Sequence, residues 1–394
     1  MCDREGRLPR VVLTCLGRFY AFDLARQLLR HGMLQKIITV YPKRYVARWG
    51  IPEDKIVSLH FIGALMYLRR KIPGRSGRVV NEFLLWFYDF VAAYKLGRDY
   101  DIAIGWSSCC LRILRAAQKR GAIGIVERAS THIEEQKRLL LEERQITKNP
   151  NQPIPSERVI RRELAEYAQA DYIMSPSQFT KKTFLQRGFP ASKLLSNPFG
   201  VDLTDFSPRT TCCEHPFTII HCGLLSIRKG VHYLLKAFAE LDLPDARLKL
   251  IGAVKDEIRP FLARYQHPRI QIAGVFPLKE LAQQYSDGSV FCLCSIEEGM
   301  AMVVPQAMAC GLPVIVTENT GTSDIVADGK NGFVIPIRDV ETLKQKIRFL
   351  YENPEICREM GRNALASAKQ ALSWDDYGDR AAAIYQKCFQ EHQG

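Results

Sequence analysis

The sequence predicts an α/β protein of two Rossmann-like domains that face each other. The chain opens with an apolar strand over Val11–Cys15, a helix over residues 22–30 and a strand over residues 36–40, which is typical of a parallel sheet. This alternation breaks at residues 196–202, where Asn, Pro and Gly indicate a linker. A second alternation begins at Thr218–Cys222, so two halves of similar size meet near residue 200.

Each half continues with apolar strand-like runs separated by helical stretches. In the first half, further strands are expected over residues 101–106, 123–127 and 172–175. In the second half the expected order is helix, strand, strand, helix and strand, over Val231–Leu241, 248–251, 270–273, Leu278–Ser286 and 290–294. The first turn lacks the Gly-x-Gly-x-x-Gly pattern, which argues against a dinucleotide-binding site there.

Charge is unevenly distributed along the 394 residues. The net charge is +13, but residues 1–200 carry 34 Lys/Arg against 18 Asp/Glu, whereas residues 201–394 carry 21 against 24. The basic first half suits an anionic membrane surface, an anionic acceptor or nucleic acid, and a solvated face without a partner is the alternative. No RNA- or DNA-binding motif accompanies the charge, so nucleic acid is not an expected partner.

The twelve cysteines are expected to be buried thiols in a reducing compartment. Several lie in apolar runs, among them Cys15, Cys222 and Cys292, and no Cys/His cluster has zinc spacing. No secretory signal is visible, and the longest apolar stretch, residues 83–94, contains Asp89 and is too short to span a bilayer. The expected location is therefore cytoplasmic, with peripheral contact at the inner face of the plasma membrane as an open extension.

Residues 295–326 form the most informative segment. An apolar strand over residues 290–294 leads into a loop with Glu297, Glu298 and Gly299. A short helix follows, with Pro305 near its first turn and Gly311 after its end, and a second apolar strand is expected over residues 314–316. Free backbone N–H groups at a helix start can hold phosphate, and a carboxylate can bind sugar hydroxyls. The segment is therefore a candidate site for a sugar diphosphate, and a plain scaffold unit is the alternative.

The residue pattern of this segment resembles the nucleotide-sugar signature of the retaining family 4 glycosyltransferases. Glu298 fills the position of the first Glu, and residues 307–314 match the Ala-Met-Ala-x-Gly-x-Pro-Val tail. Met300 and Ala301 replace the usual Phe-Gly, and Gln306 stands where a second Glu is usual. The resemblance implies the GT-B architecture, in which two Rossmann-like domains face a central cleft and the second holds most of the donor.

The same resemblance implies domain bounds and donor contacts. It implies an acceptor-side domain over residues 1–200, a nucleotide-sugar domain over 201–375, and a last helix over 376–394 that crosses back to the first domain. Glu298 would hold donor-sugar hydroxyls, and Gln306 would accept from ribose. Backbone N–H groups of residues 299–301, which are Gly299, Met300 and Ala301, would meet the diphosphate.

A second basic element follows the strand at Thr218–Cys222. Arg228 and Lys229 lie at a turn that opens a helix, where two cations can neutralise a diphosphate, although such a turn is often only solvated surface. The element is similar to the family's Gly-Arg-Leu-x-x-x-Lys-Gly, with Gly223 and Lys229 in place. Leu224 occupies the usual Arg position, so Arg228 is expected to supply the missing cation.

The first domain offers weaker candidates. Gly17 follows the first strand, where the family has a glycine loop near the donor phosphates, and a plain turn is the alternative. His132 follows a strand at the position of a family His that contacts the donor sugar, and a structural histidine is equally compatible. Glu127 and Arg128 are lesser candidates, with a structural ion pair as the alternative.

A basic and aromatic segment lies between these candidates. The cations at 69–71, Arg75 and Arg78 precede the aromatic-rich run 83–88. This pattern fits an interfacial membrane contact, and it also fits a core helix beside a solvated loop.

Taken together, these features predict a retaining glycosyltransferase that moves a sugar from an NDP-sugar to a sugar- or lipid-linked acceptor hydroxyl in polysaccharide or glycoconjugate biosynthesis. Catalysis would depend on Glu298, Lys229, Arg228 and His132, with no metal and no cofactor beyond the donor. An NDP-sugar epimerase and a non-catalytic sugar-nucleotide-binding protein are the alternatives.

Overall fold

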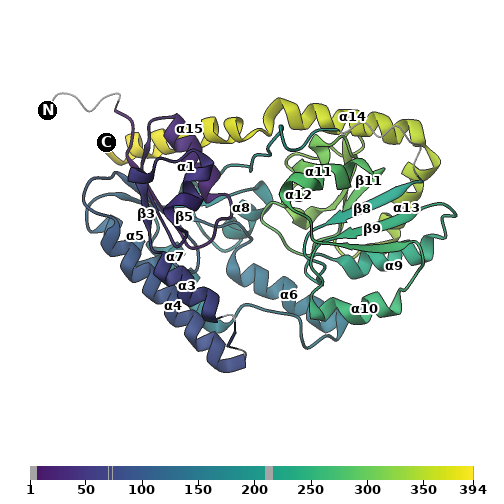
Figure 1. Ribbon diagram of the computed structural model, residues 1–394, viewed down its shortest axis with the longest axis horizontal. Coiled ribbons are helices and arrows are strands. Elements are labelled where there is room, and N and C mark those ends of the chain that lie inside the picture. The colour runs from purple at the N-terminus through teal and green to yellow at the C-terminus, as the bar shows by residue number, and fades with distance from the viewer. Residues whose placement is uncertain (1–6, 70, 73, 209–215, 394) are drawn as a thin grey trace.

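The computed structural model describes residues 7–69, 71–72, 74–208 and 216–393, and it contains two α/β domains side by side (Figure 1). Within these residues the first domain holds a seven-stranded parallel sheet in the order β3-β2-β1-β4-β5-β6-β7. Its strands are β1 Val11–Cys15, β2 Leu34–Thr39, β3 Ile56–Ser58, β4 Ile102–Trp106, β5 Ile123–Glu127, β6 Tyr172–Ser175 and β7 Leu194–Ser196.

The second domain repeats the plan with a smaller sheet. In the described part of the chain this sheet has six parallel strands in the order β10-β9-β8-β11-β12-β13. Its strands are β8 Thr218–Cys222, β9 Arg247–Ile251, β10 Ile270–Gly274, β11 Val290–Leu293, β12 Val314–Thr317 and β13 Gly332–Ile335. The predicted fold class is confirmed, because both halves form parallel α/β sheets.

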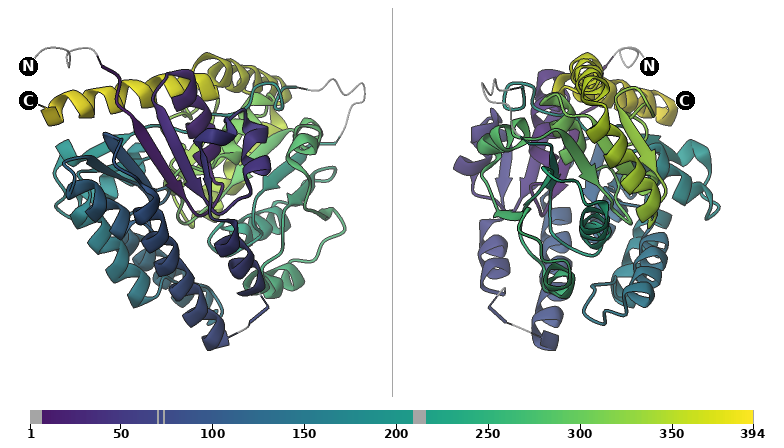
Figure 2. Two further views of the ribbon diagram at one scale, coloured as in Figure 1. Left: turned by 60° about the vertical axis from the view of Figure 1, so that its left-hand side comes forward. Right: turned by 90° about the vertical axis from the view of Figure 1, so that its right-hand side faces the viewer.

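Helices cover both faces of each sheet (Figures 1 and 2). Because parallel strands are covered on both faces, they consist of continuous apolar runs, and all five residues of β1 are buried. The α-helices are α1 Ala21–Arg30, α2 Lys43–Val46, α3 His60–Arg69, α4 Gly74–Lys95, α5 Leu111–Gln118, α6 Ile133–Thr147, α7 Glu157–Gln169, α8 Gln178–Leu185, α9 Val231–Leu241, α10 Arg259–Arg264, α11 Leu278–Ser286, α12 Val303–Ala309, α13 Val340–Glu352, α14 Pro354–Ala371 and α15 Trp374–Gln393.

Three strands were not expected from the sequence. They are β3, β7 and β13, and each lies at an edge of its sheet. β3 and β7 have three residues each, of which only the first is fully buried. A strand this short shows neither alternation nor a long apolar run, so it gives no sequence signal.

Strand order reverses once in each sheet. The reversal lies between β1 and β4 in the first sheet and between β8 and β11 in the second. Loops leaving the carboxyl ends of two such strands run to opposite faces, which leaves a crevice where ligands bind in open α/β sheets. The loops after β1, β8 and β11 are those in which the sequence placed Gly17, Lys229 and Glu298.

Two chain segments cross between the domains next to each other. Val201 of the linker donates its N–H to the carbonyl of Leu372 at 2.7 Å, and a Cβ on Gly200 would lie 2.7 Å from the Cα of Trp374. Beyond this crossing α15 lies against α1, with Gln27 Nε2 2.8 Å from Asp375 Oδ1 (Figure 2). The last helix therefore adds to the hydrophobic core of the first domain.

The described cysteines form no disulfide, and those in the sheets, such as Cys15, Cys222 and Cys292, are buried. Among the described residues no helix is long and apolar enough to cross a membrane. The same residues contain no cluster of His, Cys, Asp and Glu suited to a metal ion.

Candidate active site between the domains

Glu297 links the two domains at the carboxyl end of β11. Its side chain is completely buried and accepts three hydrogen bonds at Oε1 from Ser130 and Thr131, at 2.5 to 3.0 Å. Gln136 Nε2 donates to Oε2 at 2.9 Å. All these donors belong to the segment after β5 in the first domain, so one carboxylate holds the loop that carries the acidic signature against the opposite domain.

The charge of Glu297 is stabilised where it lies. Arg228 Nε is 3.0 Å from Glu297 Oε2 and also donates to its backbone carbonyl. Burial by itself would raise the pKa of Glu297, but Arg228 and the hydrogen bonds from the first domain lower it to about 2. Glu297 is therefore ionised at neutral pH and forms a fixed ion pair with Arg228.

Arg228 is the cation that faces both domains. Its Nη2 lies 3.7 Å from Glu298 Oε2 and 3.4 Å from Ser130 Oγ. Burial would lower the pKa of Arg228, but the carboxylates of Glu297 and Glu298 raise it above its ordinary value. Its side chain remains about a third exposed, so part of the guanidinium is open to a ligand.

Lys229 and Glu298 form the second ion pair of the site. Lys229 Nζ lies 2.8 Å from Glu298 Oε1, and both side chains are largely buried. Gly230 starts α9 at φ +66°, where a Cβ would stand 1.8 Å from the carbonyl oxygen of Cys294, so only glycine lets the helix begin this close to β11. Gly223 has a φ of +140°, a backbone conformation that favours glycine, and it lies beside Lys229.

The segment 299–301 contacts other parts of the chain in this conformation. A Cβ on Gly299 would lie 2.1 Å from the carbonyl oxygen of Ala129, so this glycine permits close contact between the domains. Met300 is buried, and its Sδ accepts from Phe199 N–H at 3.2 Å. The N–H of Ala301 donates to Thr320 O at 3.1 Å. The carbonyl of Thr320, in the turn after β12, therefore already accepts from the Ala301 N–H in this conformation, and contact of residues 299–301 with a diphosphate stays a prediction.

Gln306 lies on α12, one helical turn from the acidic loop. Its Oε1 accepts from the hydroxyl of Tyr285 at 3.4 Å, which is a long hydrogen bond, and the side chain is half-buried. The arrangement leaves its amide able to meet another hydroxyl, and contact with ribose stays a prediction.

His132 is not placed to meet a ligand in this conformation. Its ring is buried among Tyr167, Phe184 and Phe189, with ring centroids 5.0 to 5.7 Å apart. Nδ1 accepts from the N–H of Glu134 and so caps the start of α6. Burial, with Arg187 and Arg128 nearby, lowers the pKa of His132 to about 3, so the ring is neutral.

Glu127 and Arg128 are both structural. Arg128 Nη1 lies 2.9 Å from Glu163 in the protein interior, which is the structural ion pair that the sequence left open. Glu127 is buried and accepts from the hydroxyls of Tyr20 at 2.8 Å and Tyr385 at 3.3 Å. These hydroxyls lower its pKa, but burial is the larger effect and raises it to about 7.

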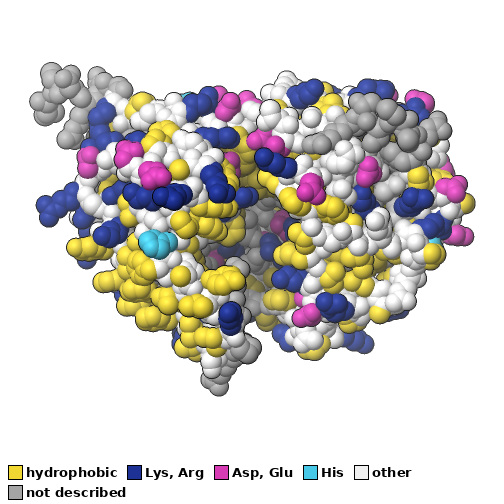
Figure 3. Space-filling model, viewed as in Figure 1, with side chains coloured by type: hydrophobic (Ala, Val, Ile, Leu, Met, Phe, Trp, Pro, Cys, Tyr) yellow, Lys and Arg dark blue, Asp and Glu magenta, His cyan; other side chains and the backbone are white. Residues whose placement is uncertain are grey.

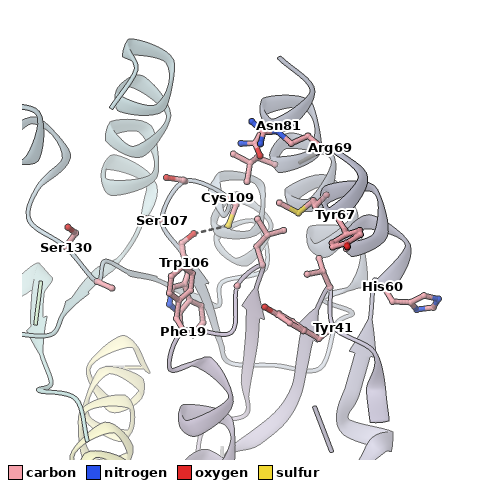
Figure 4. A pocket seen from close by; sticks show the side chains of 18 of the residues that line it. Phe19, Tyr41, His60, Tyr67, Arg69, Asn81, Trp106, Ser107, Cys109 and Ser130 are labelled. Atoms are coloured by element: carbon pink, nitrogen blue, oxygen red, sulfur yellow. Dashed lines mark hydrogen bonds between the residues drawn. The ribbon is translucent and has the colours of Figure 1, made fainter. Parts of the chain in front are cut away.

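A cavity of about 1020 Å³ opens from the first domain toward these ion pairs (Figure 4). Gly17, Trp106 and Tyr41 line one part of it, at the ends of first-domain strands. Ser130 and Arg228 line another part, so the cavity reaches the edge of the second domain at Arg228. Among the residues predicted for the site, Arg228, Lys229 and Glu298 come together, Gly17 lies along the adjoining cavity, and His132 lies apart.

Glu297 is the functional residue that sequence reasoning missed. It was recognised as part of the acidic loop, but Glu298 alone was given a role. The first-domain partners of Glu297 lie more than 160 positions earlier in the chain, so no local pattern distinguishes the clamping carboxylate from its neighbour.

A known family model matches most of the second half of the chain. Residues 207–366 match the family model described as "Glycosyl transferases group 1". The putative colanic acid biosynthesis glycosyltransferase WcaL of Escherichia coli is 28% identical over 210 residues, covering 49% of this chain and 52% of WcaL. Sulfoquinovosyl transferase SQD2 of Arabidopsis thaliana is 31% identical over 212 residues, covering 50% of this chain and 40% of that protein. The chain thus spans about half the length of the curated relatives it matches.

Solved structures support the fold over nearly the whole chain. HepE of Anabaena, crystallised in complex with UDP, superposes with a TM-score of 0.69 at 16% identity, covering 96% of this chain and 100% of HepE. At this identity the match establishes architecture alone. The GT-B arrangement implied by the sequence resemblance is therefore confirmed as a fold.

Proposed function

We propose that this chain is a retaining glycosyltransferase that transfers a sugar from a nucleoside-diphosphate sugar to an acceptor hydroxyl in polysaccharide or glycoconjugate biosynthesis. The observation that carries the proposal is the meeting of Arg228, Lys229 and Glu298 at the strand-order reversal of the second domain. This is the place where open α/β sheets bind ligands, and the residues have the charges that a sugar diphosphate requires. The family model over residues 207–366 supports the same conclusion.

Donor binding would rearrange the ion pair of Lys229 and Glu298. Lys229 Nζ would move from the carboxylate to a diphosphate oxygen, since the diphosphate carries two negative charges against the one of the carboxylate. Glu298 would then be free to accept from the donor sugar's hydroxyls. Arg228 would add its exposed guanidinium edge while Glu297 keeps it oriented.

The transfer itself would need little covalent chemistry from the protein. The bond between the anomeric carbon and the diphosphate oxygen breaks, and a bond from that carbon to the acceptor oxygen forms on the same face. The hydroxyl proton passes to the departing diphosphate, which leaves as NDP. Lys229 and Arg228 would stabilise the charge that grows on the leaving group, so no metal or resident cofactor is included in this proposal.

Sugar nucleotides provide the direct test. Thermal unfolding of the full chain would be followed with UDP-, GDP-, ADP- and dTDP-sugars, because a ligand at about 100 times its Kd adds about 2.7 kcal/mol of stability. We expect a selective rise in Tm that is lost in Lys229→Ala. Lys249→Ala is the matched control, since Lys249 forms an ion pair of similar length with Asp287, 2.9 Å, in the same domain.

Product analysis separates the three functions considered. Release of NDP that depends on an acceptor supports the transferase. Formation of an isomeric sugar nucleotide without acceptor would instead identify an epimerase, and binding without turnover across a broad acceptor screen would identify a non-catalytic protein.

A further inference from the structure

We propose that the acceptor is a lipid of an anionic membrane, that α3 and α4 dock on this membrane, and that the cavity beside them receives the lipid. This inference rests on the proposed function and names its acceptor class. It is carried by three features of the first domain: an apolar patch, an excess of basic residues in the segment that forms it, and a cavity that runs from α3 and α4 to Arg228.

The apolar patch covers the outer faces of α3 and α4. Ten of the twenty large hydrophobic side chains that are exposed in the described residues fall between positions 61 and 94. Apart from Tyr67, those on α3 and those on α4 recur three or four residues apart, so each helix carries a stripe of them on one side. The residues that define the patch are Phe61, Leu65 and Leu68 on α3, and Phe83, Trp86 and Phe90 on α4. Figure 3 shows hydrophobic side chains gathered on the surface where Figure 1 places α3 and α4.

The inner face of α4 is apolar as well. Leu84, Tyr88 and Ala92 are buried against the domain, while Phe83, on the opposite side, is 56% exposed. A surface helix normally presents polar residues to water, and a helix that is apolar all round is typical of a non-aqueous environment. The outer stripe is also ordered, because the ring of Trp86 stacks on that of Phe90 with centroids 5.8 Å apart. The exposed apolar patch is therefore expected to contact an apolar partner.

Charge indicates which partner this is. Residues 60–95 contain six Lys and Arg but only Glu82 and Asp89 as acids. Asp89 is buried and held by Arg162 at 3.0 Å, and Glu82 pairs with Arg158, so neither acid opposes the cations. At the patch itself the Arg112 guanidinium lies 5.2 Å from the ring of Trp86. Aromatic rings flanked by cations match the interface of an anionic bilayer.

The cavity lies between α3 and α4, whose outer faces carry the patch, and the candidate active site. Its outer wall is formed by Ala64 and Tyr67 of α3 and by Leu85 of α4, and Tyr67 is 64% exposed at the surface. Its inner end is formed by Ser130 and Arg228, beside the pair of Lys229 and Glu298. Figure 4 shows Tyr67 and Ser130 on opposite sides of the space.

The difference between the polar inner end of the cavity and its wall at α3 and α4 defines an expected orientation for the acceptor. The hydroxyl-bearing head would lie at Ser130 and Arg228, where the donor sugar is expected, and the hydrocarbon would follow the wall of α3 and α4 back to the bilayer. Ala64, Met66 and Leu85 give that wall an apolar part, which favours the lipid-linked acceptor over the purely sugar-linked one. Polar side chains also line it, namely His60, Tyr67, Arg69 and Asn81.

Vesicle flotation of the full chain tests the docking. We expect binding to vesicles of phosphatidylcholine and phosphatidylglycerol, at least about tenfold weaker binding to phosphatidylcholine alone, and loss of binding in high salt. The variant Phe83→Ser/Trp86→Ser/Phe90→Ser should lose binding at least about tenfold. Val275→Ser/Leu278→Ser removes exposed apolar residues from the second domain and should bind like the unmodified chain. Unchanged melting curves would show that the variants fold.

Brominated lipid chains test the cavity by quenching tryptophan fluorescence. Trp86 is first replaced by Phe, so that the patch no longer contributes tryptophan fluorescence. We expect brominated anionic vesicles to quench the remaining fluorescence, and we expect this effect to shrink in Trp86→Phe/Trp106→Phe, because Trp106 lines the cavity. Equal quenching in both proteins would show that no chain enters the cavity.

Two further outcomes would overturn the proposal. One is that anionic vesicles leave the chain unbound. The other is that the triple variant converts a dimer to a monomer on gel filtration, which would assign the patch to a second copy. Sugar-nucleotide binding is measured without vesicles and keeps the two proposals separate. A chain that binds sugar nucleotides but not vesicles refutes the lipid inference alone. A chain that binds vesicles but not sugar nucleotides refutes the transferase and the acceptor role that depends on it, and leaves only the membrane docking.

Discussion

Lys229 and Glu298 neutralise each other across the ends of β8 and β11, with Nζ and Oε1 2.8 Å apart. Each is thus held by the other at the place where a diphosphate and a sugar would be bound. Because both side chains are largely buried, neither can remain unpaired at low cost. Donor binding is therefore expected to supply phosphate oxygens to Lys229 and hydroxyls to Glu298 together.

Removing the ammonium group should affect the reaction more than the fold. We expect Lys229→Ala to lower kcat/KM by at least about a hundredfold, which corresponds to about 2.7 kcal/mol of transition-state stabilisation. Steady-state kinetics on an identified acceptor would measure this. Lys229→Arg keeps the charge and should recover part of the rate. Near-normal turnover by Lys229→Ala would remove Lys229 from the leaving-group role.

The amide at position 306 should limit donor affinity. Gln306→Glu would place a carboxylate near the expected ribose, and a charge-assisted hydrogen bond is worth about 1 kcal/mol more than a neutral one. We therefore expect the Kd for the sugar nucleotide to fall about fivefold by calorimetry. Tyr285 can still donate to the new side chain, as it does to Gln306. An unchanged or higher Kd would show that ribose lies elsewhere.

A substitution at Gly299 tests how closely the two domains must approach each other. In Gly299→Ala the new Cβ would lie 2.1 Å from the carbonyl oxygen of Ala129, which is backbone and cannot rotate away. We expect the domains to separate locally, with weaker clamping by Glu297 and at least tenfold weaker donor binding. Donor titration and small-angle scattering would report the two effects. Full affinity with an unchanged scattering profile would contradict this account.

The raised pKa of Glu127 predicts a specific dependence of the free energy of unfolding on pH. Burial raises its pKa from 4.5 to about 7, so the native state binds the proton more tightly than the unfolded chain. The stability contribution is complete below about pH 4.5 and is lost as pH rises through about 7. At about 1.4 kcal/mol per pKa unit, the loss approaches about 3 kcal/mol.

Replacing this carboxyl group should remove the dependence. Glu127→Gln retains an acceptor for the hydroxyls of Tyr20 and Tyr385 but never ionises. We expect the Tm of the variant to exceed that of the unmodified chain at pH 8 and to approach it at pH 5. Parallel Tm curves from pH 5 to pH 9 would show that Glu127 does not titrate in this range.

Much of the fold could be predicted because its signals are local. The runs Val11–Cys15 and Thr218–Cys222 are apolar throughout, as strands covered on both faces must be. Gly311 ends α12 at φ +82°, as a glycine after a helix commonly does. The three-residue strand Ile56–Ser58 was missed because its pairing with β2, and not its composition, makes it a strand.

The candidate site divides in the same way. Lys229 and Glu298 were found because each belongs to a short pattern whose residue types suit a sugar diphosphate. The burial of His132 among three aromatic rings, the occupied N–H of Ala301 and the cavity beside α3 depend on segments far apart in the chain.

The sequence by itself determined the two α/β halves, the linker near residue 200, and the acidic and basic loops that meet in the site. Only the tertiary structure decided that Glu297 clamps the domains and that α3 and α4 present an apolar face. The physical reason is that periodicity and turn chemistry depend on neighbours a few residues away, whereas burial and ion pairing depend on which distant segments share a surface. The first-domain partners of Glu297 are more than 160 positions away in the sequence, and folding alone brings them within 3.0 Å of its carboxylate.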